Sequence, residues 1–209
     1  MSILSGKDQP VFKNGAQTLN QFLETNMVYP LYSKNNCIQG VIKVEFQLTK
    51  TGEVVHSRVK EGLGIDLDEE ALRLIQLTNQ KWIVPKDFSE NTEIVIPVKF
   101  SLKNYNCENR SKPQIEKAIA LYQSRQTMEN VVTSYYQNKI AGTVSGINEE
   151  QINQLKADLG FDDDLVAEKL EDAQKMLNQG DKSGACKILN FIKHIGYTNA
   201  DTLIEQNCK

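Results

Sequence analysis

The residues best suited to chemistry in this chain are four cysteines and two histidines. The cysteines stand far apart, at Cys37, Cys107, Cys186 and Cys208. None forms a C-x-x-C pair, and His56 and His194 are the only imidazoles, so the sequence predicts no metal site. The pattern fits either four buried thiols in a cytoplasmic protein or two disulfides in an exported one.

Other patterns with catalytic potential have structural explanations. The acidic run Asp68–Glu70 could carry acid–base chemistry, but acidic residues are typical of the first turn of a helix, which Asp66 or Asp68 would cap. The segment 142–146 has its serine one place late for a G-x-S-x-G nucleophile elbow. No phosphate-binding glycine loop or H-E-x-x-H motif is present. The sequence therefore predicts no enzymatic activity and no cofactor.

Composition indicates a soluble globular protein without affinity for polyanions. The net charge is -3, and 40% of the residues are hydrophobic and 24% charged. This balance favours neither nucleic acid nor an anionic membrane surface. No apolar run approaches the ~20 residues that cross a bilayer. The first residues lack the features of a secretion signal, so either the chain is cytoplasmic or a targeting segment lies outside this sequence.

The segment Glu93–Leu102 is predicted to be an edge strand. Its apolar residues recur at a spacing of two and fall on one face: Ile94, Ile96, Val98, Phe100 and Leu102. Proline cannot donate a hydrogen bond to a neighbouring strand, so Pro97 restricts this strand to an edge or a bulge. An apolar edge invites pairing with another chain.

The preceding residues are predicted to form the elements that support this strand. Strict alternation marks Gly40–Thr49 as a strand with one solvated face, and Gly52 lies in the turn to a second strand, Glu53–Lys60. In that strand we expect Val55 and Val59 to point inward and His56, Arg58 and Lys60 outward. Residues 1–15 are predicted to be a flexible lead-in, Ala16–Asn26 and Leu31–Asn36 to be helical, and Trp82 to anchor the core.

Residues 106–209 are predicted to form an all-α domain. A capping box at Ser111–Gln114 and later caps at Asn148 and Asp162 open helices, which glycines close. The part from Leu165 to Gln206 resembles a tetratricopeptide-like helical hairpin followed by a capping helix. The similarity lies in Gly180-Asp181, Gly184-Ala185-Cys186 and Ala200.

Residues 17–102 resemble the C-terminal domain of TonB, and most closely the energy transducer TonB proteins. The matching motifs occur in the family's order: Tyr29-Pro30, Gly40, Gly52, Leu67-Asp68-Glu69-Glu70-Ala71-Leu72-Arg73, Lys81-Trp82 and Pro97-Val98-Lys99-Phe100. The resemblance implies an α+β domain over residues 16–105, with a three-stranded antiparallel-type sheet in the order β-β-α-β and helices on one face. Structural roles are implied for Tyr29, Pro30, Gly40 and Trp82.

The same resemblance implies a function in the periplasm. Such domains capture the TonB box, an extended segment of an outer-membrane transporter, by strand addition during energy-dependent uptake. The residues expected to contact the added strand are Glu93, Val95, Pro97, Lys99 and Ser101. A full energy transducer also has a membrane helix and a proline-rich spacer, which this sequence lacks, and it has no helical tail. The alternative is a periplasmic interaction or scaffolding module without energy transduction, with a further protein partner bound by the helical domain.

The family's strand order also implies a cysteine pairing. It brings Cys37, before the central strand, to the same end of the sheet as Cys107. Cys186 and Cys208 lie on consecutive helices that can pack antiparallel. We therefore expect the disulfides Cys37–Cys107 and Cys186–Cys208, and with them an exported protein.

Overall fold

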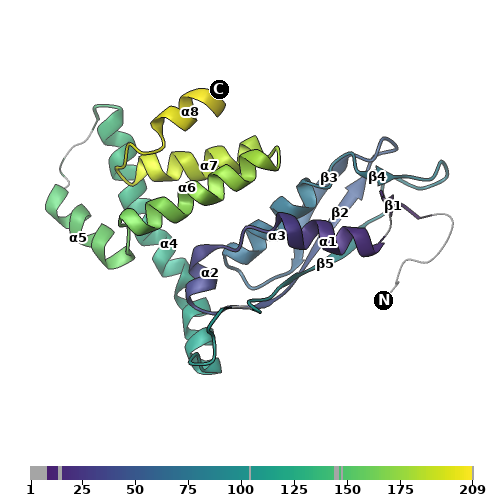
Figure 1. Cartoon of the computed structure of the whole chain (residues 1–209), viewed down its shortest axis with the longest axis horizontal. Helices are drawn as coiled ribbons and strands as arrows, with labels where there is room; N and C mark the ends of the chain where they lie inside the picture. Colours follow the sequence, from purple (N-terminus) through teal and green to yellow (C-terminus); the bar gives the residue numbers. More distant parts are fainter. Residues whose placement is uncertain (1–8, 14–15, 104, 144–145, 147, 209) are drawn as a thin grey trace. The chain divides into compact units, whose positions relative to one another are not determined.

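The computed structural model describes residues 9–13, 16–103, 105–143, 146 and 148–208. The chain divides into two units, Met1–Ile119 and Ala120–Lys209, and the boundary falls within helix α4, Lys112–Ile140 (Figure 1). The predicted fold class is confirmed, since sheets and helices come first and helices alone follow. The elements before α4 are β1 (Val11–Phe12), α1 (Ala16–Asn26), α2 (Leu31–Asn35), β2 (Gly40–Leu48), β3 (Val54–Glu61), α3 (Asp66–Gln76), β4 (Trp82–Ile83) and β5 (Ile94–Phe100).

The main sheet of the first unit has the strand order β3-β2-β5, with both pairs antiparallel. Its central strand β2 buries four side chains on one face: Ile42, Val44, Phe46 and Leu48. Helix α3 packs against β2 and β3 with its own apolar stripe of Leu67, Ala71, Leu74 and Ile75. The period of two in the strand and the helical spacing in α3 therefore create the core between them.

Strand β3 contains an irregularity that the sequence analysis missed. His56 has a positive φ of 51°, and the pairing register shifts between Glu45 and Gln47. Such a bulge inserts an extra residue into one strand, so the side chains before it point to the opposite face from the one expected by continuing the alternation of the residues after it. Val55 therefore pairs with Gln47 on the outer face, and Val54 is the buried residue, so the prediction that Val55 points inward was wrong.

Part of the predicted flexible lead-in is an ordered strand. Val11 and Phe12 form β1 and pair antiparallel with Ile83 and Trp82 of β4. The Phe12 ring is buried, and its centroid lies 5.5 Å from that of Trp82. Burial of these two aromatic side chains explains why so short a strand pair forms.

The acidic residues at the start of α3 serve tertiary contacts. Neither Asp66 nor Asp68 is the N-cap as predicted, since that position is Ile65, which makes no side-chain capping bond. Asp66 instead accepts hydrogen bonds from the backbone and hydroxyl of Ser33. Asp68 accepts a bond from the backbone N–H of Gly64 at 2.8 Å. These carboxylates fix the loops around the helix start.

Glu70 and Arg73 form a buried ion pair one turn further along α3. Arg73 Nε donates to Glu70 Oε2 at 2.7 Å, and the two side chains are 13% and 5% exposed. Glu70 also accepts from the backbone N–H of Val28 at 2.7 Å, and Arg73 donates to the carbonyl of Asn26 at 2.8 Å. The pair therefore connects α3 to the last residue of α1 and to the segment that follows it.

Two of the implied structural residues, Tyr29 and Trp82, are anchored by hydrogen bonds. The Tyr29 hydroxyl donates to the carbonyl of Ile38 at 2.6 Å, and burial, with the nearby Asp66 charge, raises the pKa of Tyr29. The phenol therefore remains a protonated donor at physiological pH. Trp82 Nε1 donates to Thr78 Oγ1 at 2.9 Å. Of the other two, Pro30 is the N-cap residue of α2 and Gly40 opens β2.

Gly52 forms the predicted turn between β2 and β3 and has a φ of +83°. A Cβ at this position would lie 2.6 Å from the carbonyl oxygen of Trp82. We therefore expect Gly52→Ala to lower the free energy of unfolding by about 1–3 kcal/mol, because strain and a backbone clash add. Thermal unfolding followed by fluorescence of Trp82 measures this change. Gly64→Ala is the matched control: φ is +71° there, but nothing lies within 4 Å of the added Cβ, so a smaller loss is expected.

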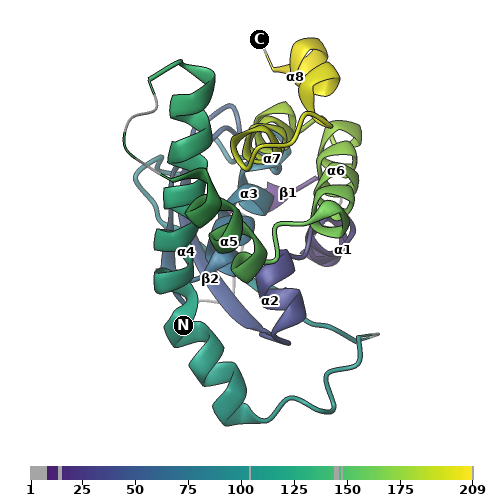
Figure 2. The ribbon, with the colours of Figure 1, turned by 90° about the vertical axis from the view of Figure 1, so that its left-hand side faces the viewer.

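The second unit is helical and contains the rest of α4 (Lys112–Ile140), α5 (Glu149–Leu159), α6 (Asp163–Asn178), α7 (Lys182–His194) and α8 (Asp201–Asn207). Helices α6 and α7 pack together as a hairpin, and α8 contacts α7. Figure 2 shows these three helices from a second direction. The predicted caps are confirmed, since Asn148 and Asp162 each accept a hydrogen bond from the first turn of their helices.

Both expected disulfides are present. Cys37 pairs with Cys107 in the first unit, across a sequence separation of 70 residues. Cys186 pairs with Cys208 in the second unit and connects α7 to the residue after α8. The first bond forms because β2 and β5 are antiparallel, which brings the start of one beside the end of the other.

Candidate peptide-binding edge

Strand β5 lies at one edge of the main sheet and pairs only with β2 among the described strands. The pairing is continuous from Ile94, opposite Phe46, to Phe100, opposite Gly40. Pro97 stands at the middle, opposite Lys43. The predicted position of this strand at an edge is thus observed. Glu93 and Ser101 lie immediately outside its bounds.

The position of Pro97 determines which backbone groups β5 presents outward. Residues in an antiparallel ladder alternate between pairs that exchange both hydrogen bonds and pairs that exchange none. Pro97 has no N–H, so its pair with Lys43 belongs to the second kind. By alternation Val95 and Lys99 do so too, and their N–H and C=O groups point away from β2. The outer edge therefore offers carbonyls at 95, 97 and 99 but N–H donors only at 95 and 99.

Apolar side chains flank these backbone groups on both sides of the sheet. Ile96 lies on the inner face but is only half-buried, unlike Val98 and Phe100 of the same face. On the outer face Val95 is half-buried and Pro97 is exposed. An added strand would cover this surface, which gives the middle of β5 a hydrophobic as well as a backbone contribution to binding.

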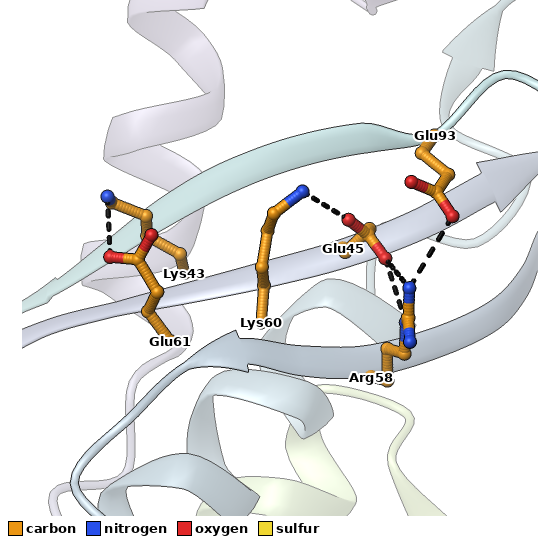
Figure 3. A network of polar contacts seen from close by, with 6 residues as sticks. All are labelled: Lys43, Glu45, Arg58, Lys60, Glu61 and Glu93. Atoms are coloured by element: carbon orange, nitrogen blue, oxygen red, sulfur yellow. Dashed lines mark hydrogen bonds and ion pairs between the residues drawn. The ribbon is translucent and has the colours of Figure 1, made fainter. Parts of the chain in front are cut away.

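The outer face next to this edge carries a network of ion pairs (Figure 3). At its centre is Glu45 of β2, whose side chain is 3% exposed and is contacted by Arg58 and by Lys60, the latter at 2.5 Å. The two cationic side chains lie over the carboxylate and shield it from solvent; it is not buried in the hydrophobic core. Glu93 reaches the same Arg58 at 3.5 Å, and Lys43 pairs with Glu61 at 2.6 Å.

The network makes stability depend on pH. Hydrogen bonds from Lys60 and Arg58 hold the pKa of Glu45 below its ordinary value of 4.5. A carboxyl with a depressed pKa in the folded state stabilises the protein above the unfolded-state value, and this contribution is lost as pH falls through the folded-state value. We expect Glu45→Gln to be less stable than the wild type at pH 7 and to lose less stability between pH 5 and pH 3. Thermal unfolding across that range measures the difference, and parallel curves would contradict it.

Sequence reasoning found the edge but missed the ion pairs beside it. The alternation in β2 and β3 indicated only a solvated face, with no sign that Glu45 is covered by two cations. A signal was available in the sequence: charged residues stand two apart on both strands of the predicted hairpin, at Lys43 and Glu45 and at Arg58 and Lys60. Opposite charges that face each other across an antiparallel strand pair stabilise that pair.

The residues considered for catalysis do not form a site together. His56 is exposed on the β3 bulge, and His194 Nδ1 lies 3.1 Å from Gln137 Nε2 in the second unit. All four cysteines are in disulfides. Within the described ranges, no group of three or more His, Cys, Asp or Glu side chains could hold a metal ion. No helix in the part of the chain that the structure describes is long and apolar enough to span a membrane.

Part of the chain matches a known protein family. Residues 25–102 match the family model described as Gram-negative bacterial TonB protein C-terminal. The matched segment includes β2, β3, α3, β4 and β5, and hence the whole main sheet and its β5 edge. No curated protein and no solved structure matches the chain.

Proposed function

We propose that this protein, whose residues 25–102 match the C-terminal domain of Gram-negative bacterial TonB, binds the TonB box of an outer-membrane transporter in energy-dependent uptake. The bound segment adds to the sheet along β5, beside Glu93, Val95, Pro97, Lys99 and Ser101. The observation that carries the proposal is a continuous strand at the sheet edge with outward backbone groups and apolar flanks.

Backbone recognition suits a protein that must engage receptors of differing sequence. Main-chain hydrogen bonds contribute affinity for any extended segment, and the side chains at alternate positions add preference. A docking function of this kind needs no catalytic residues, so we also propose that the protein is not an enzyme.

The proposed location is the periplasm. Two disulfides support it, because such bonds persist in oxidising compartments. The periplasm is also the compartment in which TonB C-terminal domains meet transporters, which agrees with the matched family.

The second candidate is an interaction or scaffolding module that uses the same fold without energy transduction. What favours it is the helical unit, in which α4 exposes Leu121, Met128 and Val131 at helical spacing. Exposed apolar side chains on one side of a helix are typical of protein–protein contacts. In this case the helices bind a further protein partner, and the predicted tetratricopeptide-like hairpin would contribute to that surface.

A peptide titration distinguishes the two candidates. TonB-box peptides from transporters of the same genome are added to the isotope-labelled full chain, and amide signals are followed. The first candidate is expected to shift signals of residues 93–102 at up to millimolar peptide. Shifts confined to α4–α8, or none, would favour the second.

Substitution at Val95 tests the binding mode. Val95→Pro removes one of two outward N–H donors without affecting the ladder with β2, so we expect the peptide to bind about tenfold more weakly. Val95→Ala keeps the N–H and is the matched control, for which we expect less than a threefold change. Peptide dissociation constants and thermal unfolding of both variants are measured. Equal affinities for the two variants would exclude strand addition at this position.

A further inference from the structure

The side chains on the outer face along β5 carry opposite charges at the two ends of their row. Glu93, Val95, Pro97 and Lys99 project on the same side because strand residues alternate. The row thus has an anion at one end, a cation at the other and two apolar residues between. At about 3.3 Å per residue, the two charges lie roughly 20 Å apart.

Lys99 differs from the other cations of this face. Arg58 and Lys60 contact Glu45, and Lys43 contacts Glu61. Lys99 is exposed, and no carboxylate is paired with it among the described residues. Its neighbour across the ladder is Val41, which is itself 50% exposed and carries no charge. An incoming strand can therefore supply Lys99 with a counter-ion.

Glu93 at the opposite end is only weakly neutralised. Its side chain is 51% exposed, and its contact with Arg58 is long, at 3.5 Å. Arg58 is held mainly by Glu45, to which it donates two contacts. The carboxylate of Glu93 therefore remains available to a cation on an added strand.

Pro97 lies between the two charges and interrupts the row of donors. A uniform edge would let a guest strand shift by two residues at little cost, because the backbone hydrogen bonds repeat. Here a shift of two residues moves both guest charges away from Glu93 and Lys99, whereas Pro97 leaves one guest carbonyl without a donor in every register. The two charges thus select a single register.

We propose that the segment bound at β5 carries a basic side chain beside Glu93 and an acidic side chain beside Lys99, six residues apart on one face. This inference rests on the proposed strand addition and specifies the chemistry of its partner. Directly opposed charges on neighbouring strands attract, whereas like charges repel. The recognised segment is an extended peptide with opposite charges at its two ends and apolar residues at the alternate positions between them.

The test uses three extended peptides of equal length and apolar content. One has an acidic residue six positions before a basic residue, the second has the reverse order, and the third has glutamine at both positions. We expect one charge order to bind about ten- to thirtyfold more tightly than the other, with the neutral peptide between them. The preferred order also gives the strand direction, since an antiparallel guest places its first residues beside Lys99.

Variants of the full chain establish that the two residues cause the preference. Glu93→Lys combined with Lys99→Glu is expected to invert it, and Lys99→Gln alone is expected to reduce it. The control is Lys112→Glu combined with Glu116→Lys, which exchanges an exposed pair at the start of α4 and is expected to change nothing. Because salt screens exposed charges, the preference should also shrink between 50 and 500 mM salt, where the Debye length falls below about 5 Å.

The outcomes separate this inference from the proposed function. If all three peptides bind equally and the variants do not alter this, the charge rule is wrong, but strand addition stands. If no peptide binds, including the neutral one and the TonB-box peptides, both fail. Inversion by the double variant, with folding shown unchanged by thermal unfolding, would establish Glu93 and Lys99 as specificity-determining residues.

Discussion

Replacing Cys37 and Cys107 together by alanine is expected to lower the free energy of unfolding of the first unit by about 4 kcal/mol. The bond closes a loop with a sequence separation of 70 residues. Without it the unfolded chain gains the conformational freedom of that whole loop, and the stabilisation grows with loop length. Cys37 is buried and has a φ of +55°, a conformation that is unfavourable for cysteine and alanine alike, so the expected loss comes from the missing bond.

The single tryptophan makes this measurement specific. Trp82 is buried in the first unit, so its fluorescence during denaturant unfolding reports that unit. The matched control is the Cys186/Cys208 double alanine variant, whose bond spans 22 residues in the second unit and for which about 3 kcal/mol is expected, read from far-UV circular dichroism. Reductant should reproduce the loss in the wild type. A change below about 1 kcal/mol in the Trp82 transition of the Cys37/Cys107 variant would contradict the prediction.

Replacing Arg73 by methionine is expected to cost about 3–5 kcal/mol, because it leaves the buried carboxylate of Glu70 without its counter-ion. The methionine fills a similar volume, so the loss is electrostatic and does not come from a cavity. The Asn26 carbonyl also loses its donor, which adds to the cost.

A double variant isolates the ionic part of this effect. Glu70→Gln combined with Arg73→Met removes both charges, and the glutamine oxygen still accepts from the Val28 N–H. We expect the double variant to be more stable than Arg73→Met alone, and denaturant unfolding with Trp82 fluorescence measures both. If the second substitution adds its own loss to the first, the two residues do not act as a pair.

Much of the first unit was predictable because its signals are periodic. Alternation in β2, helical spacing in α3 and the proline in β5 each have one simple structural solution, and they predicted these elements and the position of β5 at an edge. The order β3-β2-β5 was implied by the resemblance to the TonB C-terminal domain, and that order brought Cys37 beside Cys107. Periodicity and resemblance together therefore predicted the edge, the fold class and both disulfides.

What the sequence did not reveal depends on contacts between distant segments. A strand of two residues such as β1 has no period, and it forms only because Phe12 meets Trp82. The bulge at His56 needs a backbone conformation that no residue type there signals. Asp66 and Asp68 looked like helix caps, but their carboxylates are used by Ser33 and by the loop before α3. Local propensity cannot anticipate such partners.

The same limit applies to the candidate site. Alternation identified Glu93, Val95, Pro97, Lys99 and Ser101 as the outward row. Which charges in that neighbourhood are already paired follows only from the cross-strand register, which sets Glu45 opposite Arg58 and Lys99 opposite Val41. The contrast between neutralised and available charges is therefore a property of the assembled sheet.

The position of the Cys37–Cys107 bond has a mechanical consequence. All three strands of the main sheet lie between these two cysteines in the sequence, so the bond encloses them in a covalent ring. Tension applied to the chain outside residues 37–107 passes through the sulfur–sulfur bond and bypasses the hydrogen bonds between β2 and β5. A pull on a strand bound at β5 is instead resisted by that ladder. The sheet can therefore carry a load at its edge without being unravelled from either end of the polypeptide.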